Sequence, residues 1–122
     1  MQSKTTEISE LCKFTDMNQL SAFADYRIPQ TLESFGAIKY SDHLICLLHK
    51  KHRFQPGDNE EVEIRGVSVH AATLIANELR DNHVEFIKIT DVVVDTFLWT
   101  YAMLDKNQCQ KLPHHLCRTV FY

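Results

Sequence analysis

Apolar residues recur every three or four positions along much of the chain, a spacing that indicates amphipathic helices. The longest pattern predicts a helix over about 59–82, and a second predicts a helix over about 91–106 that Thr90 caps. Their apolar positions are Val62, Val69, Ala72, Ile75 and Leu79 in the first, and Val94, Phe97, Leu98, Tyr101 and Leu104 in the second. Gly66 interrupts the first pattern at a cost of up to about 1 kcal/mol relative to Ala, so we expect close packing there.

The beginning of the chain divides into a polar segment, residues 1–13, and the start of a helical domain, residues 14–122. Thr15 or Asp16 is placed to cap the first helix of this domain, which we expect to run to about Tyr26. The apolar face of that helix would consist of Met17, Leu20, Phe23 and Ala24.

Two further short helices are predicted from their caps. Pro29 suits the first turn of a helix over about 30–35, and Gly36 fits the position after its end. Ser41 can cap another helix over about 42–51. The chain contains no internal repeat and no linker-like stretch, so the sequence predicts one all-α domain.

Composition and charge narrow the possible partners. The 122 residues include 13 Lys+Arg and 16 Asp+Glu, which gives a net charge of −3 and does not indicate direct binding to nucleic acid. No apolar run approaches the roughly 18 residues of a transmembrane helix, and the N-terminus lacks the apolar core of a signal peptide. We therefore expect a soluble cytoplasmic protein that binds neither a membrane nor nucleic acid directly.

The four cysteines contain no CxxC pair, and in an intracellular chain we expect them to be free thiols. A sharper alternative is a zinc site formed by Cys109, His114, His115 and Cys117. Their spacing matches no common zinc finger, and two adjacent histidines rarely bind one tetrahedral ion, so free thiols are the favoured interpretation.

Two aspartates lie in unusually apolar surroundings. Asp95 follows three valines and precedes Trp99 by four positions, so the two residues share a helical face. A carboxylate beside a large aromatic surface can hold a flat heterocycle, because the ring stacks and the acid accepts N–H groups. Phe23 and Asp25 form a second pair of this kind.

Composition and spacing alone favour a purely structural interpretation of these acids. Asp95 would then face water with Trp99 in the core, and Asp25 would pair with Arg27 or neutralise a helix end. The i,i+4 spacing of Glu61 and Arg65 predicts a salt bridge between them, at the surface or half-buried.

Five stretches resemble, in order, motifs of the queuosine salvage protein family, the queuosine 5′-phosphate N-glycosylases. Residues 20–30 read LSAFADYRIPQ, where the family has LTxFADYRVPQ. Residues 36–41 (GAIKYS), 61–65 (EVEIR) and 95–99 (DTFLW) are similar to the family's GxLxYS, EExEIR and DYYLW, and 121–122 (FY) to its aromatic terminus.

The resemblance implies a helical fold similar to that of DNA glycosylases. It implies hydrolysis of the N-glycosidic bond of a small nucleotide, queuosine 5′-monophosphate, which releases queuine for reuse in tRNA. The family's catalytic aspartate falls on Asp25, its base-contacting residues on Phe23 and Ala24, and its pocket aspartate on Asp95, with Trp99 one turn later. No metal and no organic cofactor are implied.

The matches correspond to the C-terminal part of the family. The family's N-terminal part, which adds base and phosphate contacts, has no counterpart in these 122 residues, and Thr96 replaces a family aromatic. We therefore expect the chain to expose an apolar face and to associate, either with a separate N-terminal half or as a homo-oligomer. The alternative function is a catalytically inactive nucleoside- or base-binding or interaction module that keeps the fold.

Overall fold

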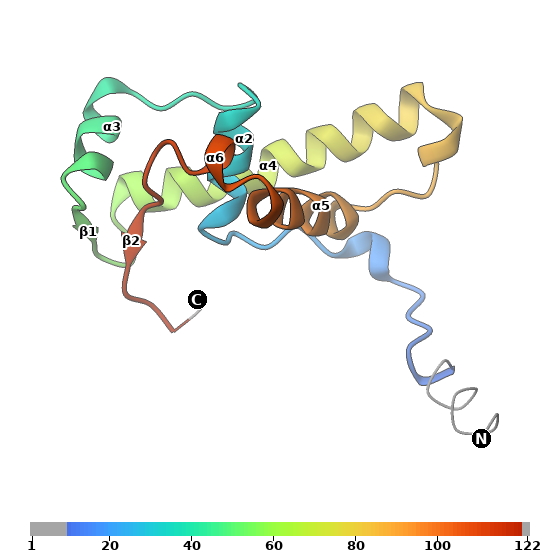
Figure 1. The fold of residues 1–122 in the computed structure, drawn as a ribbon. Helices are drawn as coiled ribbons and strands as arrows, with labels where there is room; N and C mark the ends of the chain where they lie inside the picture. Colours follow the sequence, from blue (N-terminus) through green and yellow to red (C-terminus); the bar gives the residue numbers. More distant parts are fainter. Residues whose placement is uncertain (1–9, 121–122) are drawn as a thin grey trace, which may run out of the picture.

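Helices form nearly all the regular structure of the chain, as a computed structural model of residues 10–120 shows (Figure 1). The elements are a 3₁₀ turn η1 (Met17–Gln19), α2 (Arg27–Ser34), α3 (Asp42–His49), β1 (Arg53–Phe54), α4 (Asn59–Asn82), a second 3₁₀ turn η2 (Val84–Phe86), α5 (Asp91–Leu104), α6 (Lys106–Cys109) and β2 (Leu116–Cys117). The predicted all-α class is confirmed. None of the described helices has the length and apolar composition needed to cross a membrane.

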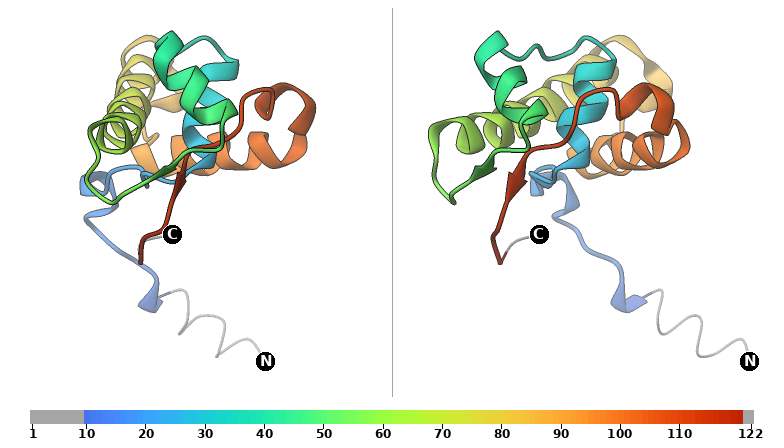
Figure 2. Two further views of the ribbon diagram at one scale, coloured as in Figure 1. Left: turned by 90° about the vertical axis from the view of Figure 1, so that its left-hand side faces the viewer. Right: turned by 60° about the vertical axis from the view of Figure 1, so that its left-hand side comes forward.

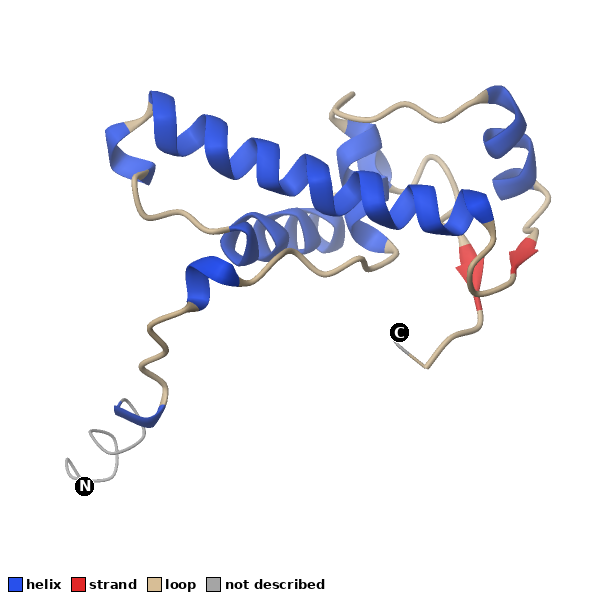
Figure 3. Cartoon of the chain, turned by 180° about the vertical axis from the view of Figure 1, so that it is seen from behind, coloured by secondary structure: helices blue, strands red, loops and turns tan. Residues whose placement is uncertain are grey.

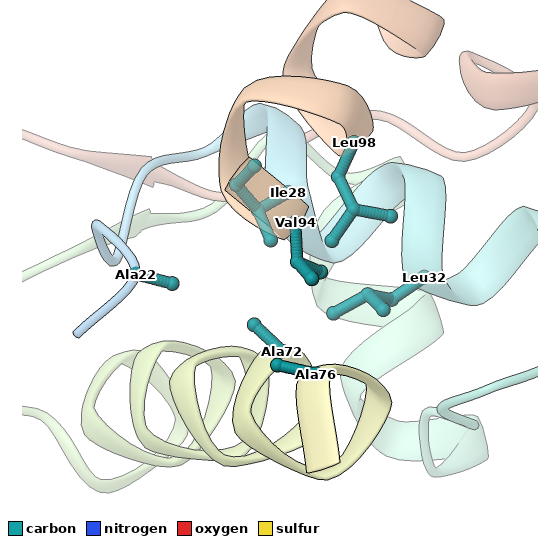
Figure 4. Packing of buried hydrophobic residues seen from close by; sticks show 7 residues of the cluster. All are labelled: Ala22, Ile28, Leu32, Ala72, Ala76, Val94 and Leu98. Carbon is teal, nitrogen blue, oxygen red and sulfur yellow. The ribbon is translucent and has the colours of Figure 1, made fainter. Parts of the chain in front are cut away.

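The main hydrophobic core lies where α2 and α5 pack against the long helix α4 (Figures 3 and 4). Its buried residues are Ala22, Ile28, Leu32, Ala72, Ala76, Val94 and Leu98. Alanines on α4 face the larger side chains of α2 and α5, so small and large residues interdigitate across the interface (Figure 4). Ala22 precedes α2, and its burial ties the segment before α2 to this core.

A second core lies at the other end of α4, where α3 and β1 cover its first turns (Figure 2). Its buried residues are Leu44, Leu48, Phe54 and Ile64. β1 pairs in parallel with β2, Arg53 opposite Leu116 and Phe54 opposite Cys117. This pairing holds the C-terminal segment against the end of the molecule that contains α3.

Several predicted boundaries are confirmed. α4 has both predicted ends. Ser41 caps α3, with its Oγ accepting the Leu44 N–H at 3.2 Å, and Gly36 follows α2 with a left-handed φ of 73°. α2 begins at Arg27 rather than at residue 30, so Pro29 occupies the third position of its first turn, where a missing N–H is still tolerated.

The predicted helix from Thr15 or Asp16 to Tyr26 is wrong. Only Met17–Gln19 form a 3₁₀ turn, Asp16 makes no side-chain cap, and residues 20–25 are not helical. A tertiary contact replaces the helical hydrogen bonds, because the Phe23 N–H is donated to the side chain of Asp95. Of the predicted apolar face, Met17, Leu20 and Phe23 are exposed, and the residue of this segment that enters the core is Ala22.

Three other expectations need correction. α5 ends at Leu104, because Asp105 leaves the helical conformation and its side chain accepts the Gln108 N–H at the start of α6. On α5, Phe97 and Leu104 are exposed rather than buried, Leu104 to 81%. A Cβ at Gly66 would meet nothing within 4 Å, so the predicted close packing there is absent among the described residues.

Candidate functional site

Asp95 is buried and has a partner. The side chain lies on α5, is 8% exposed, and accepts the backbone N–H of Phe23 through Oδ2 at 3.0 Å. Burial raises the pKa of its carboxyl; the Phe23 N–H opposes this rise, and the negative charge of Asp25 adds to it. Trp99, one turn later, is 46% exposed. The structural alternative, Asp95 in water and Trp99 in the core, is therefore wrong for both residues.

Asp25 caps α2. Its Oδ1 accepts the backbone N–H of Arg27 at 2.5 Å and that of Ile28 at 3.1 Å. The expectation that Asp25 neutralises a helix end is thus confirmed, whereas the guanidinium of Arg27 bonds to Gln30 instead. Among the described residues no group donates to Oδ2 of Asp25, so the cap fixes one oxygen and leaves the other available.

The fold brings Asp25 and Asp95 together although they are far apart in the sequence. The charge of Asp25 acts on the pKa of Asp95, and the bond from Phe23 to Asp95 holds the segment that carries Asp25 against α5. Phe23 is 74% exposed and Ala24 is half-buried. Trp99 has no ring contact with Phe23 in the described part of the chain, so the two aromatic surfaces are separate.

A cavity of about 390 Å³ adjoins this segment at Ala24. Its other walls are residues of the first half of α4, including Glu61, Arg65, Gly66 and Val69. Gly66 therefore lines an open space instead of a packed contact. The cavity combines apolar walls with one ion pair, a composition common in sites for small organic ligands.

The ion pair in that wall is half-buried, as predicted. Arg65 Nη1 lies 2.9 Å from Glu61 Oε1, and Glu61 is 2% exposed. Burial alone would raise the pKa of Glu61, but hydrogen bonds from Arg65 and from the Gly57 N–H outweigh it and lower the pKa. A carboxylate enclosed in this way stays charged because its partners replace the lost water.

His115 belongs to this cluster, and sequence reasoning did not find that role. The side chain is 3% exposed, and burial lowers its pKa to about 4, with the charges of Glu61 and Asp25 acting in the opposite direction. His115 therefore stands near Glu61, Arg65 and Asp25 as a neutral ring. Nothing in the spacing of the sequence could have placed residue 115 beside residues 25 and 61.

The zinc alternative finds no support in the described residues, where no three His, Cys, Asp or Glu side chains are grouped to hold a metal ion. Cys109 is buried beside Ser34, with Sγ 3.4 Å from Oγ, and the His114 ring lies against Tyr26 with centroids 4.7 Å apart. Cys117 pairs with Phe54 in the small sheet. All four cysteines are free thiols, as expected.

Comparison with known proteins gives one consistent result. A family model described as Queuosine salvage protein matches residues 3–122. The chain is 37% identical over 113 residues to the queuosine 5′-phosphate N-glycosylase/hydrolase of Mus musculus, a match that covers 89% of this chain and 33% of the relative. The protein of the same name from Dictyostelium discoideum is 39% identical over 114 residues, covering 92% and 33%.

A bacterial relative matches the chain to a similar extent. The queuosine 5′-phosphate N-glycosylase/hydrolase of Sphaerobacter thermophilus is 33% identical over 115 residues, covering 93% of this chain and 34% of the relative. The chain thus spans about a third of the length of the curated relatives it matches, and the match lies in their C-terminal third. These matches show that the chain belongs to the queuosine salvage protein family.

Proposed function

We propose that the chain supplies the catalytic aspartate and part of the base pocket of a queuosine 5′-phosphate N-glycosylase/hydrolase. The observation that carries this proposal is the convergence of Asp25 and Asp95 from distant parts of the sequence, with Ala24, the residue before Asp25, lining a cavity. The relatives named queuosine 5′-phosphate N-glycosylase/hydrolase support the choice of substrate.

The reaction needs a negative charge below the sugar. Water adds to the anomeric carbon, the C–N bond breaks with its electrons moving to the base, and the base takes up a proton; the products are queuine and ribose 5-phosphate. Positive charge builds on the ribose as the bond breaks, as in glycoside hydrolysis. The carboxylate of Asp25, fixed by the first N–H groups of α2, would stabilise that charge or attack the anomeric carbon.

Asp95 would hold the leaving base. Its Oδ2 is committed to the Phe23 N–H, which leaves Oδ1 to accept an N–H from the edge of the deazaguanine ring. Burial makes such a bond stronger, because little water competes at an oxygen that is nearly enclosed. The exposed rings of Phe23 and Trp99 would offer stacking surfaces for the flat base, and Ala24 would line its pocket.

The exposure of these aromatic rings also favours a second candidate, a module that binds nucleosides or bases without turnover. Phe23 is 74% exposed, so in the described residues nothing covers the outer face of the base position. A chain that spans a third of its relatives' length would need a further segment, in a longer protein or in a separate chain, to exclude water there.

The test measures queuine release from queuosine 5′-phosphate by chromatography and mass spectrometry. The chain is assayed alone and mixed with the separately expressed N-terminal two-thirds of the Mus musculus relative. We expect release by the mixture and its loss in Asp25→Asn, while Asp81→Asn, an exposed carboxylate at the end of α4, leaves it unchanged. Saturable binding of the nucleotide without any release would establish the second candidate instead.

A further inference from the structure

Nothing in the described part of the chain requires a glycine at position 66. Gly66 occupies an interior position of α4, where glycine is less favourable than alanine. It does not have the positive φ of Gly36 and Gly57, and a Cβ built on it would meet no atom within 4 Å. A glycine in such a position is explained when a second backbone or a ligand approaches the helix closely.

Gly66 lines the cavity of about 390 Å³ at Ala24, and this cavity is a groove along α4. Five of its six lining residues belong to α4, and the sixth is Ala24. Val62, Gly66 and Val69 follow one another at i, i+4 and i+7, so they form one strip of the helix surface, and Val62 is 54% exposed. In Figure 3, where α4 is the long helix at the front, no other described element crosses it.

The charged groups in the lining of the groove neutralise each other. Arg65 Nη1 lies 2.9 Å from Glu61 Oε1, and the other carboxylate oxygen of Glu61 accepts the Gly57 N–H at 3.3 Å. The remaining lining residues are Gly66 and three apolar residues, Ala24, Val62 and Val69. A groove without net charge, whose cation already has a counter-ion, is suited to an apolar occupant.

The length of the relatives indicates where this occupant comes from. The chain spans about a third of the curated relatives and matches their C-terminal third, so two-thirds of each relative lie outside the match. Apolar surface that the described residues leave uncovered marks a site of interaction, and a glycine lets a second backbone come close to the helix. The groove also reaches Ala24, the residue before Asp25, where the proposed ligand site needs a further wall to exclude water.

We propose that the groove formed by Val62, Gly66 and Val69 docks an apolar segment from the N-terminal two-thirds of a queuosine salvage protein. The docking rests on the family of the chain, and only its role in closing the ligand site rests on the proposed function. Gly66 is the position of closest approach, and the docked segment turns an open groove beside Ala24 into an enclosed site.

The experiment measures association of the chain with the N-terminal two-thirds of the Mus musculus relative, without nucleotide. The two are co-expressed and purified together, and their dissociation constant is determined by sedimentation velocity. We expect this constant to rise about tenfold or more in Gly66→Leu, because the larger side chain occupies space that the docked segment needs. A similar rise is expected in Val62→Asp, because the carboxylate would lose its water on docking.

Two matched controls lie on α4 outside the groove. Val67→Asp introduces the same charge at a position that is 49% exposed, and Glu78→Leu introduces the same apolar side chain at an exposed position. Both should associate like the parent. Gly66→Ala gives a separate signature: the melting temperature of the isolated chain should rise by a few degrees, because the added methyl group meets no atom, while docking weakens.

The proposal is overturned if the parent chain does not associate with the N-terminal part, or if Gly66→Leu and Val62→Asp associate as tightly as their controls. Circular dichroism checks the fold of each variant, and if Gly66→Leu is unfolded, the pair Val62→Asp and Val67→Asp carries the test. A shift of the isolated chain toward the monomer in Val62→Asp alone would identify a second copy as the occupant and also overturn the proposal. If docking depends on Gly66 but release of queuine does not depend on Asp25, the docking groove stands and the catalytic assignment falls.

Discussion

The carboxylate of Asp95, on α5, accepts a hydrogen bond from the backbone N–H of Phe23, two positions before Asp25. One buried acid therefore fixes the path of the segment that carries the other. Asp25 in turn caps α2, so the segment is held at both ends, by a side chain from α5 and by the first N–H groups of the next helix.

Removing the side chain of Asp95 should destabilise the protein. Asp95→Ala leaves the Phe23 N–H without its acceptor, and we expect a loss of about 1–3 kcal/mol in the free energy of unfolding. Asp95→Asn keeps an acceptor oxygen and should cost less. Urea denaturation followed by circular dichroism measures both, with the exposed Thr96→Ala as a control within about 0.5 kcal/mol of the parent. Equal stabilities for Asp95→Ala and the control would show that the hydrogen bond from Phe23 to Asp95 does not stabilise the fold.

Asp25→Asn should separate catalysis from folding. Asn caps a helix about as well as Asp, so stability should change little, whereas the charge that supports the developing cation is lost. Loss of one such electrostatic group commonly lowers the rate by about 10²–10³, and binding of the ground-state nucleotide should change far less. Steady-state kinetics of the complemented enzyme checks this. A variant with the parent rate would show that another group carries the charge.

Acid should destabilise the folded chain through protonation of His115. Burial lowers its folded-state pKa from 6.5 to about 4, so between these values the unfolded chain binds a proton that the folded chain does not. The free energy of unfolding should therefore decrease as the pH falls from 6.5 to 4, by up to about 3 kcal/mol.

His115→Gln should flatten this pH dependence whatever its effect on absolute stability, because the titrating group is gone. The matched control is His70→Gln, on the exposed side of α4, which should keep the slope of the parent. Urea titrations at several pH values give the slopes. The same slope in His115→Gln and the parent would assign the acid sensitivity to other groups.

The isolated chain should self-associate through α5. Val93, Phe97 and Leu104 recur at helical spacing and are 51%, 57% and 81% exposed, a contiguous apolar strip on one face. Phe97→Ser should shift sedimentation profiles toward the monomer, whereas Val67→Ser, an exposed residue of α4, should not. A parent chain that sediments as a monomer at all concentrations would contradict this expectation.

Local signals were sufficient to predict the helices that local contacts specify. Both ends of α4, the Ser41 cap and the left-handed Gly36 depend on neighbours within a few residues. The segment after Met17 was predicted as a helix because its apolar spacing is helical, but the acceptor of its Phe23 N–H comes from α5. No local pattern contains that information.

The candidate site was also predictable only in part. Asp25 and Asp95 stood out because an acid within an apolar run needs a partner, and the structure supplies one for each. The burial of His115 and its closeness to Glu61 depend on the pairing of β1 with β2, two segments that are far apart in the chain and show no strand pattern. Strands of only two residues are too short to show an alternating pattern in the sequence, so their pairing could not be predicted from it.

The short parallel pairing of β1 and β2 has a consequence for the order of folding. It closes a loop from Arg53 to Leu116, which costs conformational entropy. Only two residue pairs in the sheet offset that cost. Contacts among α2, α4 and α5 can form before this loop closes, so the C-terminal segment should dock last and detach first. Because that segment carries His114 and His115, the surroundings of these two rings are the last part of the molecule to form.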